Sequence, residues 1–163
     1  MLDPKLQAFH SPGGLAALEP YFRANFQRSA WEALTSAEIA ALRDSEPARP
    51  YELLRWLDAR LQSGGRLAGH LDPGGTYRLV RDIDLGADYA AARRVAAVLA
   101  LPHRLHEIAT AAATDMAEVF DTVNAYESIG CIEWTPRAPR HVDAAAEGKR
   151  GLLGKLKLPF GKK

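Results

Sequence analysis

The stretch LHEIATAAATDMAEVFDTVNAYESIGCIEW, residues 105–134, decides the fold. Apolar residues recur at helical spacing in its first third, and a capping-box pattern then predicts the start of a second, longer helix. A glycine at position 130 is the expected end of that helix, and residues 131–134 are typical of a strand. The stretch therefore predicts helix, turn, helix and strand. The residues on which this prediction rests are Leu105, Ile108, Ala109, Asp115, Glu118 and Gly130.

The same region carries the wrong charge for a protein that reads DNA. Between Leu101 and Trp134 the one basic residue is Arg104, against six acids. Lys and Arg side chains that neutralise phosphates supply most of the baseline affinity of DNA-binding proteins. We therefore expect this region to repel polyphosphate, which disfavours nucleic acid as a partner. The six acids are Glu107, Asp115, Glu118, Asp121, Glu127 and Glu133.

The N-terminal third of the chain predicts a loose leader and three helical segments. Residues 1–14 end in a Ser-Pro-Gly-Gly breaker cluster, which is typical of a leader. A helical pattern follows over 15–34, where Pro20 is expected to restart the helix. A capping box of Thr and Glu and a helix-starting proline predict further helices over 36–43 and 50–62. The residues expected to face a core in the first segment are Leu15, Leu18, Phe22, Phe26 and Trp31.

The middle of the chain predicts a hairpin and another helix. Residues 66–71 and 76–83 have the composition of strands, and the Asp-Pro-Gly-Gly sequence between them is typical of a turn. Asp88 is placed to cap a helix that runs to Ala100. The residues expected to be buried in that helix are Tyr89, Val95, Val98 and Leu99.

The order helix, turn, helix and strand resembles the winged-helix branch of the helix-turn-helix superfamily. The better copy covers residues 104–134, and a weaker second copy covers 35–83, where the hairpin would be a complete wing. The resemblance implies that the second helix of each copy is the recognition helix, which in DNA readers presents basic and amide side chains. The outward positions implied here are Glu118, Asp121, Thr122 and Ala125 in the better copy, and Glu52, Arg55 and Asp58 in the other. Neither set suits a major groove, and winged helices that have lost DNA binding often serve in protein–protein interaction.

These signals predict a mainly helical α+β fold with a small β-hairpin, winged-helix-like in two tandem copies. Four segments follow from them. Residues 1–14 are the leader, 15–86 a helical module with the hairpin, 87–135 the helix-turn-helix module, and 136–163 a flexible linker with a basic tail. The packing of the two modules stays open, since a wing could pack on the other copy or mediate a homodimer.

The tail has a composition of its own. Residues 148–163 hold six basic residues and no acid, so the tail is +6 and the rest of the +1 chain is −5. Large apolar residues stand among the lysines, which a purely solvated end does not explain. We expect reversible binding, either to an acidic protein with an apolar groove or to an anionic membrane surface. The tail residues expected to bind are Leu152, Leu153, Lys155, Leu156, Lys157, Leu158 and Phe160.

No residue set in the sequence predicts catalysis, a cofactor or a metal. His103 and His106 are three residues apart but lack a third ligand. Asp82 and Asp84 are typical of a solvated strand edge, and Cys131 lies in an apolar run that favours a buried, inert thiol. The glycine pairs lack the Gly-Lys-Ser/Thr that a phosphate loop requires.

The sequence favours a non-enzymatic bacterial adaptor or regulatory protein that acts through protein–protein interaction, with the tail as a second docking motif. Trp56 lies off the apolar strip of its helix, so we expect it at the module contact or on a partner surface, with Glu118 and Asp121 as further partner-binding residues. A nucleic-acid-binding transcriptional regulator and a membrane-surface module remain alternatives. The lack of a long apolar run and of a signal peptide favours the cytoplasm.

Overall fold

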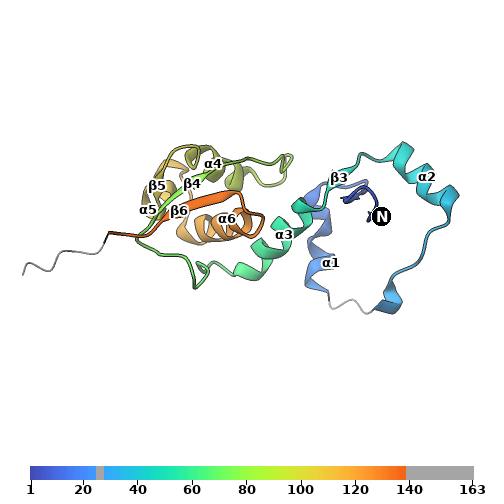
Figure 1. Cartoon of the computed structure of the whole chain (residues 1–163), viewed down its shortest axis with the longest axis horizontal. Coiled ribbons are helices and arrows are strands. Elements are labelled where there is room, and N and C mark those ends of the chain that lie inside the picture. Colours follow the sequence, from blue (N-terminus) through green and yellow to red (C-terminus); the bar gives the residue numbers. More distant parts are fainter. Residues whose placement is uncertain (25–27, 139–163) are drawn as a thin grey trace, which may run out of the picture.

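A computed structural model of the chain describes residues 1–24 and 28–138. Within these ranges the fold is α+β, with six α-helices and two three-stranded antiparallel sheets. The molecule is elongated: one end is a compact body built from the second half of the chain, and the other end carries the N-terminal segments (Figure 1). The predicted α+β class is therefore confirmed.

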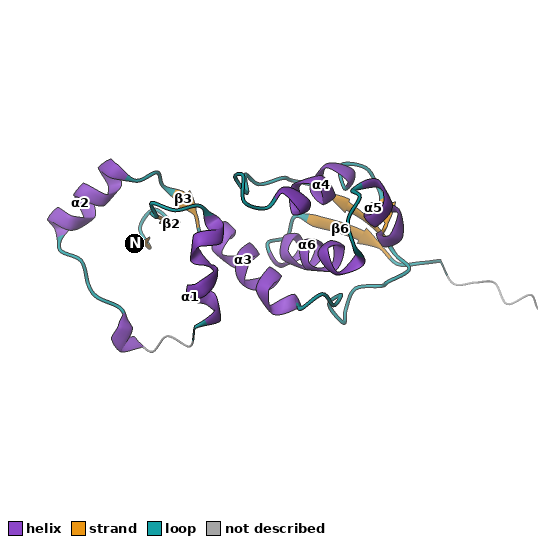
Figure 2. Cartoon of the chain, turned by 180° about the vertical axis from the view of Figure 1, so that it is seen from behind, coloured by secondary structure: helices purple, strands orange, loops and turns teal. Residues whose placement is uncertain are grey.

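The compact body packs helices against one small sheet (Figure 2). Its central strand pairs antiparallel with a strand on each side, in the order β5-β4-β6. The elements are β4 (Thr76–Leu79), α4 (Ala90–Val98), β5 (His103–Arg104), α5 (Leu105–Ala111), α6 (Met116–Ser128) and β6 (Ile132–Thr135). The helices and the strand predicted between residues 105 and 134 are thus confirmed.

Local signals set both ends of α6 as predicted. The Asp115 carboxylate accepts a hydrogen bond from the backbone N–H of Glu118 at 2.7 Å, which satisfies an amide that has no partner within the helix. Gly130 has a φ of 70°, a left-handed conformation that glycine adopts without steric cost. The chain therefore leaves α6 sharply and enters β6 two residues later.

The hairpin predicted over 66–71 and 76–83 is wrong. Residues 66–71 form no strand, and β4 pairs with β5 and β6 instead. Tyr77 in β4 lies opposite His103 on one side and Trp134 on the other. A strand from the first expected module thus completes the sheet of the second.

Two side chains explain why residues 66–71 need no strand partner. Asn124 on α6 accepts a hydrogen bond from the N–H of Ala68 at 3.0 Å and donates one to the carbonyl of Arg66 at 2.7 Å. The fully buried Tyr77 donates its hydroxyl to the carbonyl of Asp72 at 2.6 Å, and burial raises the pKa of Tyr77 to about 12. Side chains therefore satisfy backbone groups that a strand would otherwise pair.

Residues 1–14 are not a loose leader. Two short strands form an antiparallel pair, and the second also pairs with a strand that precedes α3. The physical reason is Phe9, whose side chain is buried in the core and contributes the free energy of removing an aromatic ring from water. The three strands are β1 (Leu2–Asp3), β2 (Ala8–Phe9) and β3 (Arg49–Pro50).

Pro20 restarts the helix as predicted. A 3-10 turn ends at Leu18, and the α-helix begins at the next residue with Pro20 in its first turn. Asp88, predicted to cap α4, accepts instead from the N–H of Ala16 at 3.3 Å, because Gly14 has no side chain to keep the carboxylate away from that turn. The elements of this part are η1 (Leu15–Leu18), α1 (Glu19–Arg23), η2 (Arg28–Ala30) and α2 (Ser36–Ser45).

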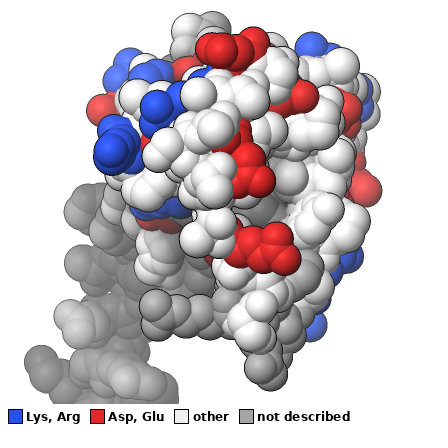
Figure 3. Space-filling view, turned by 90° about the vertical axis from the view of Figure 1, so that its right-hand side faces the viewer, with Lys and Arg blue, Asp and Glu red and all other residues white. Residues whose placement is uncertain are grey.

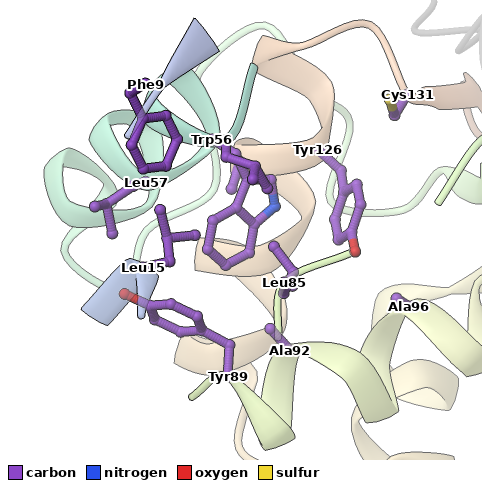
Figure 4. Close-up of a cluster of buried hydrophobic side chains, with 12 residues drawn as sticks. Phe9, Leu15, Trp56, Leu57, Leu85, Tyr89, Ala92, Ala96, Tyr126 and Cys131 are labelled. Atoms are coloured by element: carbon purple, nitrogen blue, oxygen red, sulfur yellow. The ribbon is translucent and has the colours of Figure 1, made fainter. Parts of the chain in front are cut away.

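Helix α3 (Glu52–Ser63) joins the two ends of the molecule (Figure 1). Its Trp56 ring meets Tyr89 and Tyr126 edge to face, with ring centroids 5.1 Å and 5.9 Å apart (Figure 4). Side chains from the N-terminal elements and from the loop before α4 pack into the same cluster, so one core crosses the boundary expected at residue 86. These side chains include Phe9, Leu15 and Leu85.

Candidate functional site

Helix α6 does not present the outward face that a recognition helix needs. Thr122 and Ala125, two of the four positions expected to face outward, are fully buried. Helices α3, α4 and α5 all pack against α6. A helix must be open along one face to enter a DNA groove. The outward assignment is therefore corrected: α6 is the central helix of the body.

The two acids predicted to bind a partner, Glu118 and Asp121, are engaged by α3 and by the turn that follows it. Arg60 donates to one oxygen of the Glu118 carboxylate at 2.7 Å, and the Thr122 hydroxyl donates to the other at 3.2 Å. Asp121 accepts from the N–H of Gly65 at 2.7 Å. These carboxylates therefore fasten α6 to α3.

The other four acids between Leu101 and Trp134 are also bonded within the chain. Two of them accept backbone N–H groups at helix starts, and two lie beside basic side chains. The contacts are Glu107 with Arg104, Asp115 with Glu118, Glu127 with His70, and Glu133 with Arg78. These four carboxylates therefore have partners within the chain, which a count of acids alone does not show.

Trp56 is an internal anchor and has no exposed surface. The Arg60 guanidinium lies 5.6 Å from the centroid of the Trp56 ring and 5.4 Å from that of Tyr89, a cation–π arrangement with both rings. The Trp56 Nε1 has no hydrogen-bond partner among the described residues. A fully buried ring offers no area to a partner, so the expectation of a partner surface is corrected. Trp56 instead lies where the two expected modules meet, which is the other place expected for it.

Asp82 and Asp84 serve different partners. The Tyr126 hydroxyl donates to Asp82 at 2.7 Å; burial raises the pKa of Tyr126, and this bond to a carboxylate raises it further. Asp84 accepts from the N–H of Gly86 in a turn. The two carboxylates therefore do not converge on one acid–base site.

Cys131 is fully buried as predicted, and burial raises the pKa of its thiol. His103 lies beside Glu107, with 3.8 Å between its Nδ1 and the nearest carboxylate oxygen. In the described ranges, no three His, Cys, Asp or Glu side chains gather as metal ligands would.

A cavity of about 540 Å³ lies between residues 47–50 and the loop 81–86. Glu52 on its wall accepts two hydrogen bonds from Arg81, at 2.7 and 3.0 Å. These bonds hold the pKa of Glu52 below its ordinary value. A carboxylate kept ionised in this way is poorly matched to proton transfer near neutral pH. Glu52 is therefore the ion-pair partner of Arg81.

The surface that the sequence did not predict is the N-terminal arm, defined here as residues 29–48. It stands away from the body in both views (Figures 1 and 2). Trp31 is 60% exposed and Leu34 is 37% exposed, and α2 contains no buried residue. Trp31 was expected to face a core, and this expectation is corrected.

Helix α2 is held by local and by long-range polar contacts. The predicted capping box is present: the Thr35 hydroxyl accepts from the N–H of Glu38, whose carboxylate accepts from the N–H of Thr35 at 2.7 Å. The Arg43 Nε donates to the Asp3 carboxylate at 2.7 Å. A second contact joins the end of the arm to the segment of β1 and β2. His10, which follows β2, donates its Nδ1–H to the carbonyl of Glu46 at 2.9 Å.

The arm has a distinct charge and a sequence signal that could have revealed it. Residues 29–48 contain four acids and one base, Arg43. Figure 3 looks onto this end of the molecule, where Asp and Glu side chains lie across the centre of the face and Lys and Arg toward its margins. The large apolar residues of 29–48 are Trp31, Leu34, Ile39 and Leu42. Four large apolar residues among twenty are too few to pack both a turn and a helix against a core. The composition of this segment therefore favours an exposed arm.

The predicted partner-binding residues of the tail, Leu152, Leu153, Lys155, Leu156, Lys157, Leu158 and Phe160, lie outside the described residues, as does Phe26. No protein-family model matches the chain, and comparison with curated proteins and with solved structures finds no match either. Of the helices in the described ranges, none has the length and apolar character needed to cross a membrane.

Proposed function

We propose that the protein is a non-enzymatic adaptor or regulatory module of the cytoplasm that binds a partner protein through its N-terminal arm. The observation that carries this proposal is the arm itself, which exposes Trp31 and Leu34 and a ten-residue helix with no buried side chain. Tryptophan is among the residues that contribute most to binding energy at protein interfaces. The basic tail supplies a second docking motif.

The energetics of α2 support binding by the arm. An isolated helix shorter than about 12 residues is only marginally stable in water, and most helices gain stability by packing an apolar face. In α2 the two large apolar residues, Ile39 and Leu42, are only half-buried. A partner that covers them together with Trp31 would remove apolar area from water and stabilise the helix.

The contacts of the body support a scaffold role. Ion pairs and carboxylate–amide bonds join α3 to α6, and the aromatic cluster around Trp56 joins α3 to α4 and the N-terminal elements. The titratable groups that meet in the body are used to hold these elements together. The body would thus keep the arm at a defined position.

We further propose that the body is a single winged-helix-like unit. The order α5, α6 and β6 supports this proposal, because it gives the helix, turn, helix and strand of the resemblance. In this interpretation β4, which precedes the unit in sequence, provides the third strand of the sheet. The recognition helix α6 would be a packing element, with α3 in the place that DNA would occupy.

Affinity capture with matched variants tests the proposed function. Full-length tagged protein is compared with Trp31→Ala/Leu34→Ala, and with the control Val80→Ala/Leu101→Ala, which removes exposed apolar residues of the body. A partner retained by wild type and control but lost with the arm variant supports the proposal. Titration calorimetry with the purified partner should then show at least a tenfold weaker Kd for the arm variant, about 1.4 kcal/mol.

Other results would contradict it. A partner retained equally by all three proteins would place the binding site elsewhere. Duplex DNA binding at low salt that survives deletion of residues 148–163 would favour a transcriptional regulator. Sedimentation with anionic liposomes that falls with salt and with Leu152→Asp would favour a membrane-surface module.

A further inference from the structure

We infer that the acidic arm of one copy of this chain is a docking site for the basic tail, residues 148–163, of a second copy. The inference rests on the proposed function of the arm and names one occupant for it. The arm presents exposed apolar side chains among acids, and the tail presents apolar side chains among lysines. Each is therefore suited to cover the other.

The charges of the arm and of the tail are opposite. Residues 29–48 carry a net charge of −3, from four acids and one arginine, and that arginine already donates to Asp3. The Glu32 and Asp44 carboxylates make no hydrogen bond or ion pair with the side chains or backbone that the structure describes. The tail brings six positive charges and no acid. Opposite charges of this size steer association and fix its direction.

The apolar parts of the two surfaces also correspond. Trp31 and Leu34 are exposed before α2, and Ile39 and Leu42 lie half-buried on α2. Burial of these side chains against leucines and a phenylalanine would contribute about 25 cal/mol for each Å² of apolar surface covered. The opposite charges would orient the tail on the arm as the two approach. The apolar contacts would then slow dissociation of the complex.

The arrangement of the molecule favours contact between copies over contact within one copy. In Figures 1 and 2 the arm, which carries α2, and the segment that leaves β6 lie at opposite ends of the long axis, with α3 and the body between them. A tail that reached its own arm would have to run back along the whole body. A second copy can meet the tail with no such constraint on the chain. The resulting contact is head to tail, which repeats into chains or closes into a ring.

A charge-swap mixing experiment tests this inference in full-length protein. The arm variant is Glu32→Lys/Asp44→Lys, and the tail variant is Lys155→Glu/Lys157→Glu. Masses are measured by sedimentation velocity over a range of concentrations at 50 and 500 mM salt. Wild type should associate at low salt and dissociate at high salt, because exposed charges are screened within about 10 Å at 0.1 M salt. Each variant alone should associate at least tenfold more weakly.

Mixing the two variants gives the decisive result. The arm variant keeps a good tail and the tail variant keeps a good arm, so a one-to-one mixture should form a heterodimer that neither variant forms alone. The control Asp58→Lys/Glu133→Lys reverses two acids of α3 and β6 and should associate like wild type. Circular dichroism verifies that all variants remain folded.

Three outcomes would overturn the inference. They are a wild type that stays monomeric at every concentration, association that both variants leave unchanged, and a mixture of variants that forms no heterodimer. The affinity capture described under the proposed function detects a partner protein other than this chain, and its outcome depends on Trp31 and Leu34. Intact capture without self-association would therefore reject this inference and leave the proposed function standing.

Discussion

Arg60 on α3 and Glu118 on α6 form an ion pair at 2.7 Å, and the side chains are only 16% and 17% exposed. The same guanidinium lies over the rings of Trp56 and Tyr89 and within 3.3 Å of the Thr122 hydroxyl. The Arg60 side chain thus contacts both the aromatic cluster and the polar side chains of α6 that face α3. This geometry makes the pair the main polar joint between the two helices.

Replacement of Arg60 by Met should destabilise the protein by about 2 kcal/mol. The change keeps most of the aliphatic stem but leaves the Glu118 carboxylate largely buried without a cation, and removal of one partner from such a pair is costly. Urea unfolding followed by circular dichroism measures the change. The control Arg60→Met/Glu118→Leu removes both charges and should recover much of the loss; a single variant as stable as wild type would contradict the prediction.

The elements that the sequence predicted best are those with a complete local signal. Asp115 and Gly130 mark the two ends of α6, and Thr35 with Glu38 marks the start of α2, so the boundaries follow from residues within one turn. These signals act through short backbone contacts that depend little on the rest of the fold. The α+β class followed from them.

The predictions that failed depended on contacts between distant residues. The hairpin failed because Asn124, more than fifty residues away, bonds the backbone of Arg66 and Ala68. The outward face of α6 failed because α3 covers it, with Arg60 against Glu118. Helical periodicity shows that a helix has a polar side, but a polar side can face a partner helix as well as water. The arm was missed because the helical spacing of Trp31 suggested a core contact, although residues 29–48 contain few large apolar residues.

Substitution of the two tryptophans by alanine should have very different effects on stability. Trp56 is fully buried against Tyr89 and Tyr126, so Trp56→Ala leaves a large cavity and should cost about 4 kcal/mol. Trp31 is 60% exposed, and Trp31→Ala should change the free energy of unfolding by less than about 0.5 kcal/mol. Thermal and urea unfolding of both variants measure the difference. Similar losses would show that the arm packs on the body in solution.

The contact between Asp3 and Arg43 should make the docking of α2 sensitive to acid. The Arg43 guanidinium holds the pKa of Asp3 below its ordinary value of 3.8. A carboxyl group whose pKa is lowered by folding stabilises the folded form above its ordinary pKa, and this contribution is lost as the pH falls through the lowered value. Protection of the α2 amides against hydrogen exchange should therefore drop below pH 4, roughly.

Two asparagine variants separate this effect from general acid sensitivity. Asp3→Asn should lower the protection of α2 already at pH 6 and weaken its dependence on pH. Asp44→Asn changes an exposed acid of α2 that does not contact Arg43 and should behave like wild type. Equal protection factors in all three proteins at pH 6 would show that the Asp3 contact does not hold the helix.

The turn after α3 should tolerate substitution at some glycines and not at others. Gly65 has a φ of 72°, and a Cβ there would lie 3.0 Å from the Cβ of Ala117. Its N–H also bonds Asp121, so the backbone cannot move freely to relieve the contact. Gly65→Ala should cost about 2 kcal/mol, from the left-handed conformation together with the close approach to α6.

Two neighbouring glycines provide the controls for this prediction. Gly64 has a φ of 58° but open space around its Cβ position, so Gly64→Ala should cost about 1 kcal/mol from conformation alone. Gly69 has neither a positive φ nor a close neighbour, so Gly69→Ala should stay within about 0.5 kcal/mol of wild type. Urea unfolding should show the largest loss of stability for Gly65→Ala, a smaller loss for Gly64→Ala and the smallest for Gly69→Ala. A Gly65→Ala protein as stable as Gly69→Ala would show that the bond from the turn to Asp121 does not fix α3 against α6.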